Sequence, residues 1–575
     1  MTHTRNRLWI LVLILVLLTG CSASASNSLL TDNPETAAEP ASVVQIEAGE
    51  TSPYVIVVPN RSTSELQNLA ASLQKSLKRF ADVQIDIVKD SDAEERDEEI
   101  LIGKTNREAS RTALAETLYG EYAIRTEGKK LILSGWDDAA LKIAVARLKE
   151  VVVAESTDEG LTLTEYGQHG TVFAHLGVLP VYGSIDQAVH FIELGDGSRM
   201  LYVKRSTVKT FESYLDALRE AGFEECSRRE IGKNIFAVFT GKDKILHASL
   251  SAANRDVRVT VDDAYDRSLF TEQPYEKVCE PAVHLLAVEY ASPTDPNSFA
   301  QHALGLIFRL EDGRFVIVDG NYYGEAQYGE ILDVLRELAV DKEHIVIAAW
   351  IFTHPHADHV GAFCSFSASS HKNSVKIENF LYHFPTDAQC KVTNLTGTMK
   401  NIRNALKKFG KAAQIPLQTG MVLKIGGAEI EVLYTFADAE PTTLDNGNDS
   451  SLVLRFTLAG QTVLVPGDAT DTMCKFLVQR YGNYLKSDIV QIVHHGYNGT
   501  NDFYKAVDAD VLLWPCGVRQ FYGRGDLYRI SEWEHGKTAL SLAKECFIAG
   551  AHGWTLELPY TPPDTKTVII HDGEN

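Results

Sequence analysis

The chain has 575 residues, which is too long for one hydrophobic core and indicates about three domains. Hydrophobic residues make up 45% of it and charged residues 23%, values typical of folded proteins, so wholesale disorder is excluded. With 77 acidic and 55 basic residues, the formal net charge is −22. A surface this acidic repels polyanions, so we expect no extended nucleic-acid partner. A small anionic substrate remains compatible with bound metal ions.

The N-terminal segment has the features of a targeting signal. Arg5 and Arg7 precede an almost unbroken apolar run at residues 8–18, about half the length that a bilayer-spanning helix needs. The run ends in LTGC at residues 18–21, which resembles the bacterial lipoprotein signal, where cleavage before the cysteine is coupled to lipidation of its sulfur.

The resemblance implies that residues 1–21 are a signal peptide and that Cys21 carries a lipid such as palmitate. Residues 22–42, rich in Ser, Ala and Pro, are typical of a flexible tether. The protein would then be anchored to a membrane on the extracytoplasmic side of a bacterial cell envelope. An ordinary secretory signal or an uncleaved anchor is the alternative. Seven further cysteines, widely spaced and without a C-x-x-C pair, favour free thiols over a disulfide scaffold.

The first folded region, residues 43–166, alternates predicted strands and helices and is expected to be a small α/β domain. Its motifs ILIGKTNR at 100–107 and LILSGWDDAAL at 131–141 resemble the non-catalytic N-terminal domain of some bacterial surface glycoside hydrolases. The second region, residues 170–280, combines a helix at 207–221 with short strands separated by turn residues. It is expected to be an α+β domain, and its residues indicate no role.

The third region, residues 282–575, carries the chemistry. A predicted buried strand at 345–352 is followed at once by Thr-His-Pro-His-Ala-Asp-His, residues 353–359. On such a loop, two imidazoles can point at one ion, while the acid and the last histidine point at a neighbouring position. Histidine and carboxylate ligands suit Zn²⁺, Mn²⁺ or Fe. The candidate ligands in this stretch are His354, His356, Asp358 and His359.

The motif His-x-His-x-Asp-His after a strand resembles the central motif of the metallo-β-lactamase-fold hydrolases, and other motifs of that family follow in order. Asp319 resembles the acid that supports the metal-binding loop, and residues 462–468 resemble the strand ending in Gly-Asp. The resemblance implies that Asp468 bridges two ions and that the strand at 489–496 ends in a ligand histidine. It also implies an αββα sandwich for the third region.

Within that fold, the chain is most similar to competence-protein hydrolase domains and surface choline-phosphate esterases. The similarity lies in NDSSLVLRF at 448–456, VLVPGDAT at 463–470 and VHHGYNGT at 493–500. In these branches an Asn/Ser-rich stretch replaces a ligand histidine, and here residues 446–450 likewise contain none. Two zinc ions are expected, although the shell of the first is incomplete. Of the adjacent His494 and His495, the second matches the ligand position, which leaves the first as a ligand, a substrate contact or a support.

The expected function is hydrolysis of a phosphodiester or related ester by metal-activated water, on a small molecule or an envelope polymer. Asp358 or Asp468 would orient the water. Candidate substrate contacts follow the last metal strand and are Asn498, Thr500, Tyr522 and Arg524. Two alternatives stay open. One is a lactam or amide hydrolase, and the other is a non-catalytic lipoprotein that binds envelope material or glycans through its first two regions, with a degenerate metal site.

Overall fold

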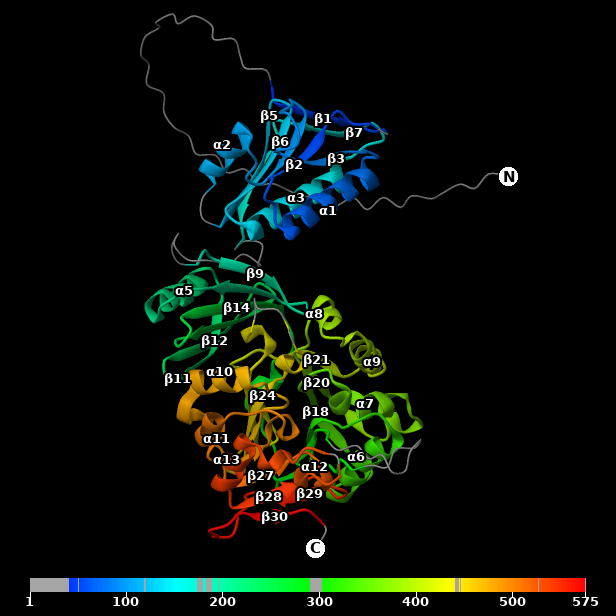
Figure 1. Ribbon diagram of the computed structural model, residues 1–575, viewed down its shortest axis with the longest axis vertical. Helices are drawn as coiled ribbons and strands as arrows, with labels where there is room; N and C mark the ends of the chain where they lie inside the picture. Colours follow the sequence, from blue (N-terminus) through cyan, green and yellow to red (C-terminus); the bar gives the residue numbers. More distant parts are fainter. Residues whose placement is uncertain are drawn as a thin grey trace, which may run out of the picture.

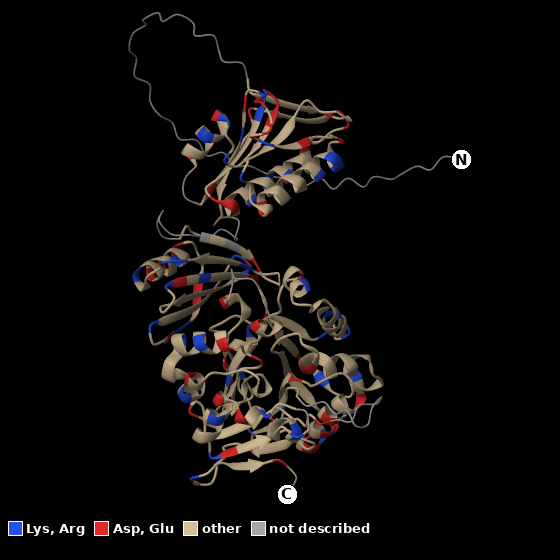
Figure 2. Cartoon of the chain, in the orientation of Figure 1, with Lys and Arg blue, Asp and Glu red and all other residues tan. Residues whose placement is uncertain are grey.

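The computed structural model describes residues 41–49, 51–117, 120–172, 179–182, 189–195, 197–289, 302–439, 444, 446–525 and 527–573. The predicted signal peptide, Cys21 and nearly all of the tether lie outside these residues. Figure 1 shows the first region at one end of the molecule and the other two packed together. No helix among the described residues is both long enough and apolar enough to cross a membrane. Acidic and basic residues are interspersed over all three regions (Figure 2), so the net negative charge is not confined to one of them.

The first region is a mixed sheet with helices on both faces. Its strand order is β3-β2-β4-β6-β5-β8, parallel as far as β6 and antiparallel beyond it. Helices α1 and α3 share a core with one face, and α2 covers the other. Strand β8 extends this sheet to Thr171. The elements are β1 (Val43–Glu47), β2 (Val55–Val58), α1 (Ser64–Phe80), β3 (Asp86–Lys89), β4 (Glu99–Ile102), α2 (Glu108–Glu116), β5 (Glu121–Glu127), β6 (Lys130–Gly135), α3 (Asp138–Glu155), β7 (Gly160–Thr164) and β8 (Gly167–Thr171), with β1 and β7 forming a separate pair.

The second region is an antiparallel sheet of order β11-β12-β13-β14-β10-β9. Helix α5 packs its buried face, which includes Phe211 and Leu215, against one side of the sheet. The other side faces the third region, where Phe236 joins a core cluster of that region. The elements are β9 (Val189–Glu193), β10 (Arg199–Val203), α5 (Val208–Glu220), β11 (Glu224–Ile231), β12 (Asn234–Gly241), β13 (Lys244–Ser251), β14 (Asp256–Asp263) and the short helix η1 (Ser268–Phe270).

The third region begins with a sheet of order β21-β20-β18-β17-β16-β15-β29, to which β19 adds beside β18. Helices α6, α7 and α9 cover its outer face. The elements are β15 (Ala282–Leu285), β16 (Gly305–Arg309), β17 (Phe315–Asp319), α6 (Glu325–Leu338), β18 (Val346–Phe352), α7 (Ala357–Ala368), β19 (Lys376–Ile377), β20 (Asn379–Tyr382), α8 (Asp387–Val392), α9 (Thr396–Leu406), β21 (Ala413–Pro416) and, from near the C terminus, β29 (Trp554–Glu557).

A second sheet of the same region has the order β22-β23-β24-β25-β26-β27-β28-β30 and is covered outside by α10 to α13. Its inner face shares one core with the first sheet, and Phe308 stacks on Phe456 across it with ring centroids 3.9 Å apart. Two sheets between two helical layers make an αββα sandwich, and the mixed α/β character predicted from the sequence is confirmed. The elements are β22 (Val422–Ile425), β23 (Ala428–Tyr434), η3 (Phe436–Asp438), η4 (Gly447–Ser450), β24 (Val453–Leu458), β25 (Gln461–Val465), α10 (Asp471–Tyr481), β26 (Ile489–Gln491), η6 (Val493–Gly496), α11 (Asn501–Val507), β27 (Val511–Trp514), α12 (Val518–Tyr522), α13 (Glu534–Leu542), β28 (Glu545–Ile548) and β30 (Ile569–His571).

A buried ion pair of the sandwich lies where the sandwich meets the second region, and hydrogen bonds from Arg258 join the two regions beside it. Arg480 on α10 bonds Asp438 at 2.6 Å, and both side chains are 1% exposed. Arg258 on β14 donates to the main-chain oxygens of Ala437 and Asp438 at 3.0 and 2.7 Å. The Arg480 guanidinium also lies over the ring of Phe236, 5.3 Å from its centroid. Charges this deep are tolerated only when they are paired, so these contacts hold the two regions in one arrangement.

Because removing one partner leaves an uncompensated buried charge, we expect Asp438→Ala to lower the free energy of unfolding by about 3 kcal/mol. The exposed pair of Lys78 and Asp82 provides the control, and Lys78→Ala should cost less than about 1 kcal/mol. Burial raises the pKa of Asp438, but the cations of Arg480 and Arg258 lower it further, leaving a net decrease. The contribution is therefore present above about pH 4 and is lost as the pH falls through the lowered pKa. Urea unfolding from pH 7 to pH 3 measures both effects, and equal losses in the two variants would contradict the prediction.

Candidate metal centre

The candidate ligands lie in loops that follow the ends of strands. Strand β18 ends at Phe352, and α7 begins after His356, so residues 353–356 form a short connection and Asp358 lies in the first helical turn. In the second sheet, Asp468 follows β25 and the histidine pair follows β26. The facing sheets bring these loops together, and two backbone hydrogen bonds fix them: Leu452 N–H to Thr353 O and His494 N–H to Gly467 O, both at 3.0 Å.

Two groups of donors converge there and share one carboxylate. The first group is His354, His356 and Asp468, and the second is Asp358, His359, Asp468 and His495. Within each group, ligand atoms lie within 4.8 Å of one another. Oδ2 of Asp468 is the common point: it lies 3.1 Å from Nε2 of His359, 3.3 Å from Nε2 of His495 and 3.9 Å from Nε2 of His354. This arrangement can hold two neighbouring metal ions.

A second set of hydrogen bonds orients the ligands. Asp319, fully buried at the end of β17, accepts from the Thr353 backbone at 2.8 Å, the Thr353 hydroxyl at 2.6 Å and His359 Nδ1 at 2.7 Å. His495 Nδ1 lies 3.1 Å from the carbonyl of Pro515, which is an acceptor only. Both rings therefore donate through Nδ1 and turn Nε2 toward Asp468, the orientation that ligand imidazoles have in metal sites.

The donor set fits metal ions, because several of its atoms are buried without a hydrogen-bond partner. They are Nε2 of His359, Nε2 of His495 and Oδ1 of Asp468. Leaving such atoms unsatisfied costs about 1–3 kcal/mol each, and more for charged groups, which a bound cation offsets. Without metal, protons bound to the candidate ligands take the place of the cation. Burial lowers the pKa of His495, but the Asp468 and Asp358 carboxylates raise it to about 9 overall. Metal binding must displace such protons.

The backbone at the site is strained where the ligands require it. Asp319, His494 and His495 have φ of 58°, 46° and 56°, in the left-handed region that residues other than glycine rarely adopt. Gly447 approaches His356 so closely that a Cβ would lie 2.5 Å from Nε2 of the imidazole. Strain of this kind persists only when the surroundings hold it, and it clusters at functional sites.

The first donor group has two histidines, and Asn448 lies beside it. Asn448 Nδ2 lies 3.2 Å from His494 Nε2, which in turn is 3.5 Å from Asp468 Oδ2. His494 Nδ1 bonds the side-chain oxygen of Asn498, and its Nε2 faces the site. The Asn448 side-chain oxygen is buried without a hydrogen-bond partner. This oxygen, and His494 Nε2 once it gives up its contact with Asn448, are thus two further candidate donors for the first group.

The other predicted substrate residues have different surroundings. The Thr500 hydroxyl accepts from Phe503 N–H at 3.2 Å and caps α11, which is a structural contact. The Tyr522 hydroxyl bonds Asp572 at 3.2 Å, and Arg524 lies over the Tyr522 ring at 5.2 Å. Tyr522 is therefore oriented toward Asp572, just after β30, and Arg524 toward Tyr522. Of the four predicted substrate residues, Asn498 is the one with a described contact to the histidine pair.

An aromatic wall beside the second donor group was not anticipated from the sequence. His302 Nε2 lies 4.0 Å from Asp358 Oδ2, and its ring centroid is 5.2 Å from that of His495. Tyr322 and Tyr497 flank it with ring centroids at 6.3 and 5.4 Å. Tyr497 follows the histidine pair by two residues, so its position could have suggested it. His302 is a lone histidine before a strand, and no motif marks it.

No protein-family profile and no curated protein matches the chain. Among solved structures, CmlA, a diiron β-hydroxylase from Streptomyces venezuelae, is similar at 14% identity over 50% of this chain and 55% of that one, with a TM-score of 0.27. The chain thus spans about half the length of CmlA. Unliganded yeast PDE1 is similar at 12% identity over 47% and 88%, with a TM-score of 0.25. A putative Zn-dependent hydrolase of the metallo-β-lactamase superfamily from Thermotoga maritima is similar at 12% identity over 50% and 98%, with a TM-score of 0.22.

The chain's own architecture and donors define its class. The αββα sandwich carries two His/Asp groups that share a carboxylate, and Nε2 of two candidate ligand histidines faces that carboxylate. Ligands of this kind leave positions open for water and substrate, which a closed structural site does not. These features define the chain as an αββα protein with a candidate two-metal centre.

Because Asp468 serves both groups, we expect Asp468→Ala to reduce bound zinc from two equivalents to less than one. His356→Ala should lose the ion of the first group only. Asp319→Asn removes support for His359 rather than a ligand, so it should keep the stoichiometry while weakening zinc affinity by about 10- to 100-fold. Metal content after dialysis and competition with a chromogenic chelator measure these effects. Equal zinc loss in Asp468→Ala and His356→Ala would contradict the shared role of Asp468.

Proposed function

We propose that the protein is a metal-dependent phosphodiesterase or related esterase, using two zinc ions and acting on the extracytoplasmic side of a bacterial envelope. The observation that carries the proposal is the single Asp468 oxygen within 3.1–3.9 Å of histidines from both donor groups. Two ions bound across one carboxylate suit an in-line displacement at phosphorus, because they stabilise the attacking and leaving oxygens together.

The chain's own residues would do the following. The bound ions would supply an activated water and polarise the ester oxygen. Asp358, 13% exposed and at the open side of the second group, would accept a hydrogen bond from the water and orient it. His302, whose Nε2 lies 4.0 Å from Asp358 Oδ2, and Asn498, which bonds His494, would hydrogen-bond the oxygens of the ester. Tyr322 and Tyr497 would exclude bulk water from one side of the substrate and contact its apolar part.

Location and partners are inferred from the sequence. We propose that Cys21 carries the lipid anchor and that residues 22–42 tether the folded regions to the membrane. The substrate would then be a small molecule or an envelope polymer within reach of the tether. The first two regions would position the sandwich and take no part in the chemistry.

The full chain, loaded with zinc, should hydrolyse bis(4-nitrophenyl) phosphate. His356→Ala should abolish this turnover, because it removes a ligand of the first group. His344→Ala is the matched control, since its imidazole is 83% exposed, and its rate should be unchanged. Release of 4-nitrophenolate measures the rate, and mass spectrometry measures the metal. Turnover of nitrocefin without turnover of the diester would support a lactam hydrolase instead, and a chain that binds no metal would support a non-catalytic binding lipoprotein.

His302→Ala should keep both zinc ions but lower kcat/KM for the same diester by about tenfold, which is about 1.4 kcal/mol of transition-state stabilisation. His302→Gln retains a hydrogen-bond donor and should recover part of the loss. Steady-state kinetics with metal analysis of the same samples test this. Loss of zinc in His302→Ala, or unchanged kcat/KM, would show that the residue does not contact the substrate.

A further inference from the structure

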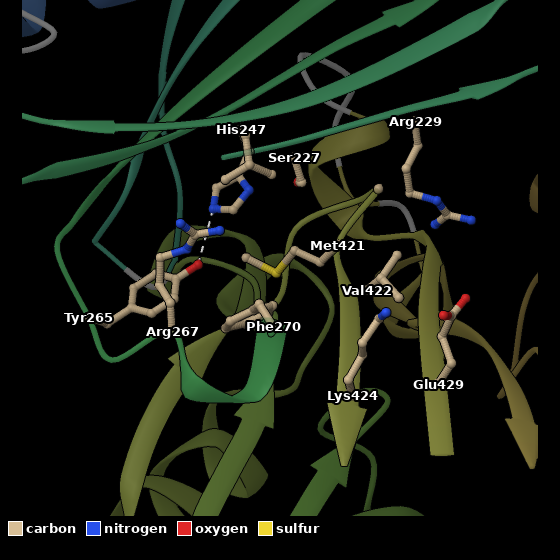
Figure 3. A pocket seen from close by; sticks show the side chains of 12 residues that line it. Ser227, Arg229, His247, Tyr265, Arg267, Phe270, Met421, Val422, Lys424 and Glu429 are labelled. Atoms are coloured by element: carbon tan, nitrogen blue, oxygen red, sulfur yellow. Dashed lines mark hydrogen bonds between the residues drawn. The ribbon is translucent and has the colours of Figure 1, made fainter. Parts of the chain in front are cut away.

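A cavity of about 310 Å³ lies where the second region meets the sandwich, away from the metal ligands. Strands β11 to β13 form one side, strands β22 and β23 the other, and the segment from Tyr265 to Phe270 closes an end (Figure 3). Small-molecule sites are concave, often lie between domains, and begin at about this volume. A molecule bound there would contact both regions at once.

One end of the cavity holds a cationic side chain. Figure 3 shows the guanidinium of Arg267 beside the imidazole of His247. Arg267 has no ion pair among the described residues, and its side chain is partly exposed. By contrast, Arg229 at the other end is matched by a bond to Glu431 and by another to the Tyr484 hydroxyl at 2.9 Å. In a chain of net charge −22, the unmatched cation is therefore at the Arg267 end.

His247 supplies a polar atom without a partner at the same end. Its side chain is 7% exposed, its Nε2 is 3.1 Å from the Tyr265 hydroxyl and 3.5 Å from Asp262 Oδ2, and its Nδ1 is buried without a hydrogen-bond partner. Burial and the charge of Arg267 lower the pKa of His247 to about 3, so the ring is neutral. When the Tyr265 hydroxyl donates to Nε2, Nδ1 carries the ring proton and becomes a donor, which suits an anion oxygen.

The middle of the cavity is apolar. Val238, Phe270, Met421 and Val422 line it, and Figure 3 shows the Met421 and Phe270 side chains between the two polar ends. An inorganic anion would leave these apolar walls uncovered, whereas the apolar part of an organic anion would pack against them. Methionine and aromatic side chains adapt well to a flat apolar body.

From these observations we infer that the cavity binds a small organic carboxylate, with Arg267 and His247 holding the carboxylate and the apolar walls holding the body. Arginine suits this role because its fork of donors matches a carboxylate. The ligand would bridge the second region and the sandwich, so its binding would stabilise their contact. This inference does not depend on the proposed reaction.

Benzoate, benzyl alcohol and inorganic phosphate are the probes, titrated into the full chain by calorimetry and by thermal unfolding, with and without EDTA. We expect benzoate to bind and to raise the Tm, and the other two to bind at least tenfold more weakly. EDTA should not change the benzoate result, because the cavity is separate from the metal centre.

Arg267→Ala should weaken benzoate binding by at least tenfold, as expected for losing a charge-assisted pair. His247→Phe, which keeps a ring but loses Nδ1, should also weaken it. Lys209→Ala is the charge-matched control, because Lys209 is exposed on α5, and it should bind benzoate like the unaltered chain. Unaltered binding in Arg267→Ala, equal binding of benzyl alcohol or phosphate, loss of binding with EDTA, or no benzoate binding at all would each overturn the inference.

Discussion

The rest of the site depends on one interaction, the sharing of the Asp468 carboxylate by both donor groups. This carboxylate belongs to the second sheet, whereas four of its neighbouring donors follow β18 of the first sheet. The two donor groups therefore exist only when the sheets pack face to face. The inner core that brings them together contains stacked Phe308 and Phe456, so a change in sheet packing would move Asp468 relative to His354 and His359. Close packing of this kind has little tolerance for such shifts.

Buried polar side chains on both sheets hold the loops that carry the candidate ligands. Gln491, fully buried at the end of β26, donates to Gly467 O at 3.1 Å and accepts from Gly467 N–H at 2.9 Å, which fixes the turn before Asp468. On the opposite sheet, Asp319 accepts from both the backbone N–H and the hydroxyl of Thr353, which fixes the start of the ligand loop. Each half of the site thus has its own buried polar support. Neither carboxamide nor carboxylate would be tolerated there unless hydrogen bonds satisfied it.

Much of this could be predicted from the sequence. The spacing in residues 353–359 and the Gly-Asp strand end identify donors because strand ends at one edge of a sandwich meet, and the structure brings them into two groups. Site residues that lie far along the sequence from these motifs were harder to predict. His302 precedes a strand without a motif, and only the packing of that strand beside β17 and the turn near Cys516 brings it to His495. The positions of Tyr522 and Arg524 depend on the turn after α12 and on Asp572, neither of which local patterns specify.

The incomplete first group has a physical consequence for metal loading. The second group offers four protein donors, while the first offers three, one of which it shares. His494 is the natural fourth donor, because its Nε2 lies 3.5 Å from Asp468 Oδ2 and its Nδ1 is held by Asn498. Reaching the ion would require the ring to exchange its contact with Asn448 for the metal. That exchange frees the Asn448 amide, whose buried oxygen already lacks a partner, so the amide can turn toward the ion or the substrate. With metal ions bound, the second position would therefore be the tighter one, and filling of the first would respond to what binds beside it.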